Sequence, residues 1–213
     1  MKKLAPKAEV SAGLKVERYF THKGKHPFDE IEWETRTAEI KDFKTGKSSF
    51  KQEDLEFPQF WSQRATDIVA SKYFRGLMGT PRREYSVKQL IGRIVDTLTG
   101  WGGKMKYFAS KEDAQAFNHE LTHLLLHQMA AFNSPVQFNV GIKKKPQCSA
   151  CFINSVEDNM ASIMKLAKTE ATIFKGGSGS GVNLSKLRAS SETLAVGGEE
   201  ITLNMNEMAK KHD

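Results

Sequence analysis

The sequence contains one pattern typical of zinc peptidases, at His119-Glu120-Leu121-Thr122-His123. Two imidazoles one helical turn apart can share a zinc ion while the glutamate acts as general base on the bound water. Helical periodicity argues against this chemistry, because Leu124 and Phe132 fall on the expected apolar face and the histidines fall opposite, as a solvated stripe would. A zinc peptidase with Glu157 or Glu170 as a further ligand stays open as an alternative.

Two other groups of residues have types and spacing suited to chemistry. Cys148 and Cys151 form a C-x-x-C pair, which can be redox-active or supply half of a zinc site, and packed inert thiols are the structural alternative. The glycines of segment 176–181 let the backbone approach a ligand and present N–H groups to an anion. This segment is neither a Walker loop nor a dinucleotide-binding turn, so a flexible linker and a phosphate-facing loop both remain open.

Composition limits the class of molecule in which these residues act. The 213 residues, 39% hydrophobic and 27% charged, suffice for one domain or two small ones with a buried core. The net charge of +7 is spread along the chain rather than gathered in a nucleic-acid-binding arm. Two cysteines are too few for a secreted disulfide framework, and neither a signal peptide nor a membrane-spanning segment is visible. We therefore expect a cytoplasmic protein with no nucleic-acid or membrane partner.

Hydrophobic periodicity predicts the elements that position these residues. Helices are expected at residues 62–74, at 86–98 with an end at the glycines of 100–103, and at 110–131 with Ser110 as the N-cap. Residues 13–46 are expected to be irregular or short-stranded, with a turn at 42–47. In the remainder, short strands are expected at 136–140, 150–153 and 182–184, and a helix at 158–174.

Several motifs in series resemble the N-terminal part of class II, adenosylcobalamin-dependent ribonucleotide reductase. They are Glu-Arg-Tyr-Phe at 17–20, His-Pro-Phe-Asp at 26–29, Ala-Ser-Lys-Tyr-Phe-Arg-Gly at 70–76, the Asn-Ser-Pro turn within 131–141, Gln-Cys-Ser-Ala-Cys-Phe at 147–152, and the glycine-rich stretch 174–185. The resemblance covers nearly everything from Gly13 to about Gly198 and assigns an ordinary helix to the zinc-peptidase pattern.

The resemblance implies an α/β fold. A mainly helical N-terminal region (1–110) would precede the first strands of an incomplete ten-stranded α/β barrel (111–198), which carries substrate and specificity-site elements. Residues 199–213 would form a divergent C-terminal tail.

The resemblance also implies roles for individual residues. In the family a thiyl radical takes the 3′ hydrogen of a ribonucleotide, and a cysteine pair supplies the two electrons that replace the 2′ hydroxyl. Cys151 matches one member of that pair, whereas Cys148 has no assigned role. The substrate-positioning residues implied are Ser134, Ser149, Ala150, Gly177 and Gly179. Asp158 and Arg188 correspond to contacts for a deoxynucleoside triphosphate effector, with a surface ion pair as the structural alternative, and no residue is assigned to a metal.

Other family residues have no counterpart in the sequence. The radical-bearing cysteine, the second redox cysteine, the cobalamin-facing residues and the C-terminal cysteine pair are absent, so we expect no complete turnover by this chain alone and marginal stability. A truncated, frameshifted or split gene would account for this. The full enzyme is expected to use adenosylcobalamin, a ribonucleotide substrate, a thioredoxin-type reductant, a homodimeric assembly and a complementing C-terminal reductase chain. The alternative is a non-catalytic nucleotide-binding or interaction fragment that keeps Asp158 and Arg188.

Overall fold

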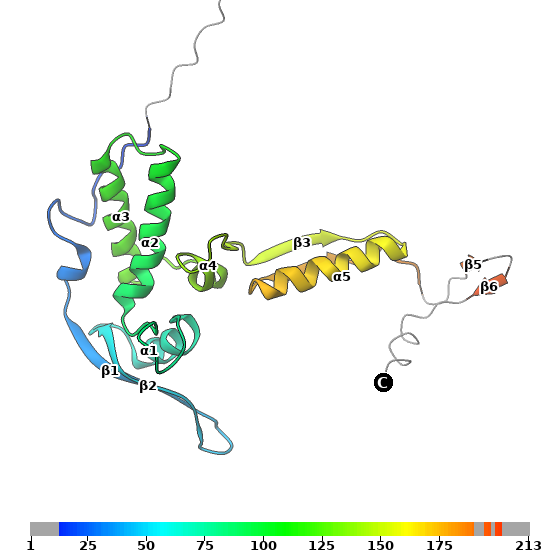
Figure 1. Cartoon of the computed structure of the whole chain (residues 1–213), viewed down its shortest axis with the longest axis horizontal. Coiled ribbons are helices and arrows are strands. Elements are labelled where there is room, and N and C mark those ends of the chain that lie inside the picture. The colour runs from blue at the N-terminus through cyan, green and yellow to red at the C-terminus, as the bar shows by residue number, and fades with distance from the viewer. Residues whose placement is uncertain (1–12, 190–193, 197–198, 202–213) are drawn as a thin grey trace, which may run out of the picture. The chain divides into compact units, whose positions relative to one another are not determined.

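The computed structural model describes residues 13–189, 194–196 and 199–201, and these fall into two compact units that divide after Cys148. The boundary expected at residue 110 falls instead between two helices that pack against each other, α2 (Val87–Lys104) and α3 (Lys111–Leu126) (Figure 1). None of the described helices is long and apolar enough to cross a membrane.

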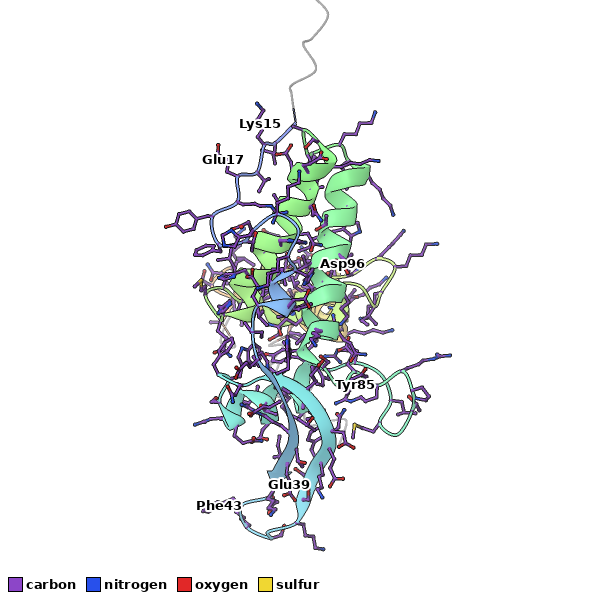
Figure 2. The ribbon with its side chains drawn as sticks, turned by 90° about the vertical axis from the view of Figure 1, so that its left-hand side faces the viewer. Lys15, Glu17, Glu39, Phe43, Tyr85 and Asp96 are labelled. Atoms are coloured by element: carbon purple, nitrogen blue, oxygen red, sulfur yellow. The ribbon has the colours of Figure 1, made fainter. Side chains whose placement is uncertain are left out.

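The first unit begins with a long antiparallel hairpin of β1 (Trp33–Lys41) and β2 (Ser48–Pro58). β1 is longer than the short strands expected within residues 13–46, and β2 lies in a stretch for which no element was predicted. Ala38, Leu55 and Phe57 of these strands are fully buried in the core. The expected turn at 42–47 is confirmed. The Asp42 carboxylate accepts hydrogen bonds from the N–H groups of Lys44 (3.0 Å) and Thr45 (2.7 Å). Figure 2 shows Phe43 at the far end of the hairpin.

Helical segments cover this hairpin and complete the first unit. The short 3-10 helix η1 (Pro27–Asp29) precedes the hairpin, and α1 (Gln63–Ile68) continues directly into the π-helix η2 (Val69–Tyr73). The helix α2 starts at a Ser86 capping box and continues through the glycines where the sequence predicted its end. The helix α3 starts at the predicted Ser110 cap and ends at Leu126, earlier than expected.

The segment predicted to be a buried strand at 136–140 is a helix, α4 (Ser134–Asn139). Its first turn is capped by the Asn133 side chain, which accepts from the Val136 N–H at 3.2 Å. At its other end the Arg93 guanidinium, from α2, donates to the carbonyls of Gln137 (2.7 Å) and Val140 (2.9 Å). The strand prediction was wrong because a distant arginine satisfies the carbonyls that so short a helix leaves open.

One hydrophobic core joins the hairpin and the helices of the first unit. Its buried members are Ala38, Leu55, Phe57, Trp61, Ala70, Phe74, Val87, Leu90, Ile91, Ile94, Val95, Leu126, Val136 and Val140.

The second unit is a β-α-β arrangement of β3 (Cys151–Ser155), α5 (Met160–Lys175) and β4 (Gly179–Asn183). The two strands pair in parallel, with Cys151 opposite Gly179 and Ile153 opposite Gly181. Burial alternates along both strands, so that one face of the sheet is half-covered and the other is exposed. A separate antiparallel pair follows, β5 (Leu194–Val196) with β6 (Glu199–Ile201). Most of the tail expected at 199–213 lies outside the described residues.

Candidate active-site elements

The zinc-peptidase pattern lies on α3 and holds an earlier part of the chain in place. His119 is 6% exposed, and its Nδ1 accepts a hydrogen bond from the Arg18 guanidinium at 3.2 Å. The Glu120 carboxylate accepts from the hydroxyl (2.6 Å) and N–H (2.9 Å) of Thr21 and from the N–H of Phe20 (3.0 Å). Burial raises the pKa of Glu120, but these hydrogen bonds outweigh burial and lower the pKa overall.

The solvated histidine stripe expected on α3 is therefore wrong. The ring of His123 stacks on Phe20 at 4.9 Å and lies 4.1 Å from the ring of His127, which stacks on Phe60 at 5.2 Å. Burial, reinforced by the charge of His26 and Arg18, lowers the pKa of His119, and burial together with His123 lowers that of His127. α3 is covered on one face by α2 and on another by the segment 18–21. The periodicity of a single helix identifies one apolar face and does not detect a second covered face.

This packing leaves the zinc-peptidase alternative without support. The acceptor nitrogen of His119 and both oxygens of Glu120 are engaged by the segment 18–21. No group of three or more metal-binding side chains comes together among the described residues.

The two cysteines have different surroundings. Cys148, the last residue of the first unit, is half-buried, and burial raises the pKa of its thiol. Cys151 is exposed and is the first residue of β3. A thiol at that place is accessible to a substrate or a second thiol, whereas the Cys148 thiol is held as the less reactive protonated form.

The glycine-rich turn lies directly against the residues that precede Cys151. The Gly179 N–H donates to the Ala150 carbonyl at 2.7 Å, and the Ser178 hydroxyl donates to the Ser149 carbonyl. Gly177 has φ +83°, a backbone conformation that favours glycine. The structure thus brings together five of the predicted site residues, namely Cys151, Ser149, Ala150, Gly177 and Gly179.

Sequence reasoning missed the side chains that hold this turn. Besides Ser178, a polar link joins β3, β4 and α5: Asn154 donates to the Ser180 hydroxyl at 2.8 Å, and that hydroxyl donates to Glu170 at 2.9 Å. These hydrogen bonds fix β4 beside β3 on the helix-covered face. The alternation of glycine and serine over 176–181 was the available signal, since serine in a glycine-rich turn often bonds local backbone.

Asp158 and Arg188, predicted as effector contacts with a surface ion pair as the structural alternative, are paired with each other. The Arg188 Nε lies 2.6 Å from an Asp158 carboxylate oxygen, and its Nη2 donates to the Asp158 carbonyl at 3.3 Å. Both side chains are about one-third exposed, at 29% and 32%. A neighbouring pair, Lys186 with Glu157 at 2.6 Å, connects the same two segments.

Ser134, the remaining predicted substrate residue, lies in the first unit at the start of α4. Its hydroxyl is 3.1 Å from the hydroxyl of Tyr73, the last residue of the π-helix η2. π-Helical turns are uncommon and are often found at functional positions. Tyr73 belongs to the 70–76 motif, but the sequence analysis assigned it no role in a site.

An apolar cavity of about 340 Å³ lies in the first unit beside Tyr73. Its walls include Trp61, Ile68 and Phe132, and few polar groups face it. A corrin macrocycle with its amide side chains and nucleotide tail needs a far larger and more polar surface. This cavity therefore does not fit a corrin macrocycle.

The first unit, a hairpin covered by helices, is followed along the chain by a parallel β-α-β unit that has an exposed cysteine and a glycine-rich turn on adjoining strands. Residues 34–128 match the family model of the class II vitamin B12-dependent ribonucleotide reductase, and residues 149–208 match that of the ribonucleotide reductase barrel domain. The chain therefore belongs to the class II vitamin B12-dependent ribonucleotide reductases, of which it matches the N-terminal part. The barrel match continues past Gly198, where the sequence resemblance was expected to end.

Curated relatives agree with the two family matches. A vitamin B12-dependent ribonucleotide reductase of Streptomyces coelicolor is 54% identical over 190 residues, which are 89% of this chain and 20% of that protein. One from Rhodopirellula baltica is 44% identical over 217 residues, covering 88% of this chain and 21% of the relative. A ribonucleoside-diphosphate reductase large subunit of African swine fever virus matches over 75 residues at 39% identity, 35% of this chain and 10% of the relative. The chain spans about a fifth of the length of the vitamin B12-dependent relatives.

Proposed function

We propose that this chain provides the N-terminal part of a ribonucleotide reductase that converts ribonucleotides to 2′-deoxyribonucleotides. The observation that carries the proposal is the position of Cys151, exposed on β3 and directly opposite Gly179 of the glycine-rich turn, within a segment matched by the reductase barrel family. Cys151 would be one of the two thiols that become a disulfide as the substrate gains two electrons. The second thiol and the radical-bearing thiol would come from parts of the enzyme that this sequence does not cover, or from a complementing reductase chain.

The residues around Cys151 support a substrate-positioning role. Ser149, Ala150, Gly177 and Gly179 form a turn-and-strand surface that is held by the Gly179 N–H and the Ser178 hydroxyl. The glycines leave room for a ribose or phosphate to approach this surface without adding a competing acid or base. Ser134 would be a further hydroxyl contact for the substrate.

A deoxynucleoside triphosphate effector would bind at Asp158 and Arg188. The Arg188 guanidinium suits a phosphate, and the Asp158 carboxylate suits a sugar hydroxyl. Because the two side chains are paired with each other at 2.6 Å, effector binding would exchange this ion pair for contacts with the nucleotide. Adenosylcobalamin, a thioredoxin-type reductant and a homodimeric assembly would belong to the full enzyme, with the cobalamin held outside this chain.

The redox role is tested by joining this chain to the remaining part of a relative and assaying deoxynucleotide formation. Cys151→Ser should abolish multiple turnover, whereas the matched control Cys148→Ser should retain most of it, because Cys148 is half-buried with a raised pKa. The reverse ranking would refute the assignment. Saturable deoxynucleoside triphosphate binding without any reductase activity in the joined protein would favour the non-catalytic nucleotide-binding fragment instead.

A further inference from the structure

Three arginines gather around one carboxylate where the π-helix η2, the loop 74–86 and α2 meet. Arg93 and Glu84 form an ion pair at 2.6 Å, with side chains 11% and 10% exposed. The other Glu84 oxygen accepts from the backbone N–H of Arg75 at 2.8 Å. Both oxygens of Glu84 are thus occupied, while Arg75 and Arg83 bring two further positive charges to the same place.

The guanidinium groups of Arg83 and Arg93 are fully used inside the protein. Arg83 donates to the carbonyls of Ala70 (2.6 Å) and Phe74 (2.7 Å) and to the Gln52 side chain (2.9 Å). Arg93 donates to Glu84 and to carbonyls of η2 and α4. These two arginines therefore have structural tasks, and no ligand is needed to explain them.

Arg75 differs from its two neighbours. Its guanidinium donates to a single acceptor among the described residues, the Lys72 carbonyl at 2.9 Å, and its Nε is buried without a partner. The guanidinium lies 4.7 Å above the ring of Phe138 on α4. Burial and the charges of Arg93 and Arg83 lower the pKa of Arg75, and the single carboxylate of Glu84 opposes them. The charge of Arg75 is therefore half-buried and not neutralised.

An uncompensated, half-buried charge is costly, and an oxyanion removes that cost when it binds. The guanidinium is planar and presents paired N–H donors, a geometry that matches phosphate oxygens. Phe138 supports one face of the group, so its orientation is set in advance. The exposed side chains of Lys72 and Arg82 lie close by in the sequence and extend the positive field toward solvent.

We propose that Arg75 is the anchor of an anion-binding site on the first unit, and that this site takes a phosphate group. The site uses the free guanidinium donors, the Phe138 ring beneath them and the surplus positive charge of the arginine cluster. It does not depend on the redox role of Cys151. The Phe138 ring beneath Arg75 also stacks on the ring of Tyr73, at 5.4 Å. The Tyr73 hydroxyl in turn contacts Ser134.

The test measures the melting temperature of the full chain while inorganic pyrophosphate is added at constant ionic strength. The wild-type melting temperature should rise saturably, and Arg75→Gln should lose the rise or weaken the apparent Kd at least tenfold. Arg82→Gln is the matched control, since Arg82 is exposed in the same loop, and should retain the rise. Without pyrophosphate, Arg75→Gln should melt no lower than wild type, because it removes an uncompensated charge.

A second measurement covers the case in which Arg75→Gln fails to fold. The Nε–H resonance of Arg75 in the wild-type chain should shift saturably with pyrophosphate and less with malonate, a dicarboxylate. A larger response to malonate would replace phosphate by a carboxylate as the ligand and overturn the proposal. An unchanged resonance, or equal stabilisation of wild type and Arg75→Gln, would equally overturn it.

Discussion

Gly102 lies inside α2, although the glycines of 100–103 suggest that the helix ends there. A Cβ at this position would lie 2.5 Å from the Phe108 ring, which packs across the helix. Gly100, one half-turn earlier in the same helix, has open space around its Cβ position. From sequence both glycines look like helix terminators, and only the fold shows that one of them accommodates a ring.

These two glycines make a matched pair of substitutions. Gly102→Ala should destabilise the first unit by about 1–3 kcal/mol, because Phe108 must move out of its place. Gly100→Ala should instead stabilise it by about 0.5–1 kcal/mol, since alanine loses less backbone entropy in a helix. Urea unfolding followed by tryptophan fluorescence gives both values, because Trp33, Trp61 and Trp101 all lie in the first unit. Equal effects of the two substitutions would contradict the role given to Gly102.

The elements show which parts of the fold are local in origin. The Ser110 cap and the 42–47 turn were predicted because their hydrogen-bonding partners lie within a few residues. The strand that starts at Cys151 was predicted from its local run of β-prone residues, although its hydrogen-bonding partner is the distant strand β4. The hairpin length, the helix α4 and the covered faces of α3 depend on partners tens of residues away. The candidate site also has a part that the sequence did not predict. The glycine-rich turn contacts the strand of Cys151 only because β3 and β4 pair in parallel, and this pairing is not local.

The packing of α3 predicts how the first unit responds to acid. The pKa values of His119 and His127 are lowered from 6.5 in the folded chain, so the folded state favours neutral rings more than the unfolded chain does. Their stabilising contribution is therefore present above pH 6.5 and is lost as the pH falls through the lowered folded-state pKa values. The urea midpoint of the first unit should fall between about pH 7.5 and 5.5.

Histidine variants separate this effect from general acid sensitivity. The double variant His119→Gln and His127→Gln should flatten the pH dependence of the urea midpoint over this range. The control His22→Gln, at an exposed position, should leave it unchanged. A midpoint that rises on acidification would contradict the direction of the two pKa shifts. The lowered pKa of Glu120 adds a further loss of stability only at lower pH, near and below the ordinary glutamate value of 4.5.

At the scale of the whole molecule, the two units bury very different amounts of apolar surface. The first unit has one continuous core from β1 to α4. Among the described residues of the second unit, Val156 and Ile173 are the buried hydrophobic side chains, and Ile153, Met160, Met164 and Phe174 are between 54% and 89% exposed. Two parallel strands and one helix are also fewer elements than an independently stable sheet needs.

We therefore predict that the isolated chain has one stable unit and one marginal unit. In native-state hydrogen exchange, the amides of α2 should exchange only through global unfolding of the first unit, whereas those of α5 and β4 should exchange through local opening at low free energy. Limited proteolysis should cut first within the second unit and leave an N-terminal fragment with intact tryptophan fluorescence. If α5 amides exchanged as slowly as those of α2, the second unit would have to be stabilised by packing beyond the side chains described. Joining the chain to the remaining part of a relative should slow exchange in α5 and β4 and leave α2 unchanged, because the exposed sheet face and helix surface would then be covered.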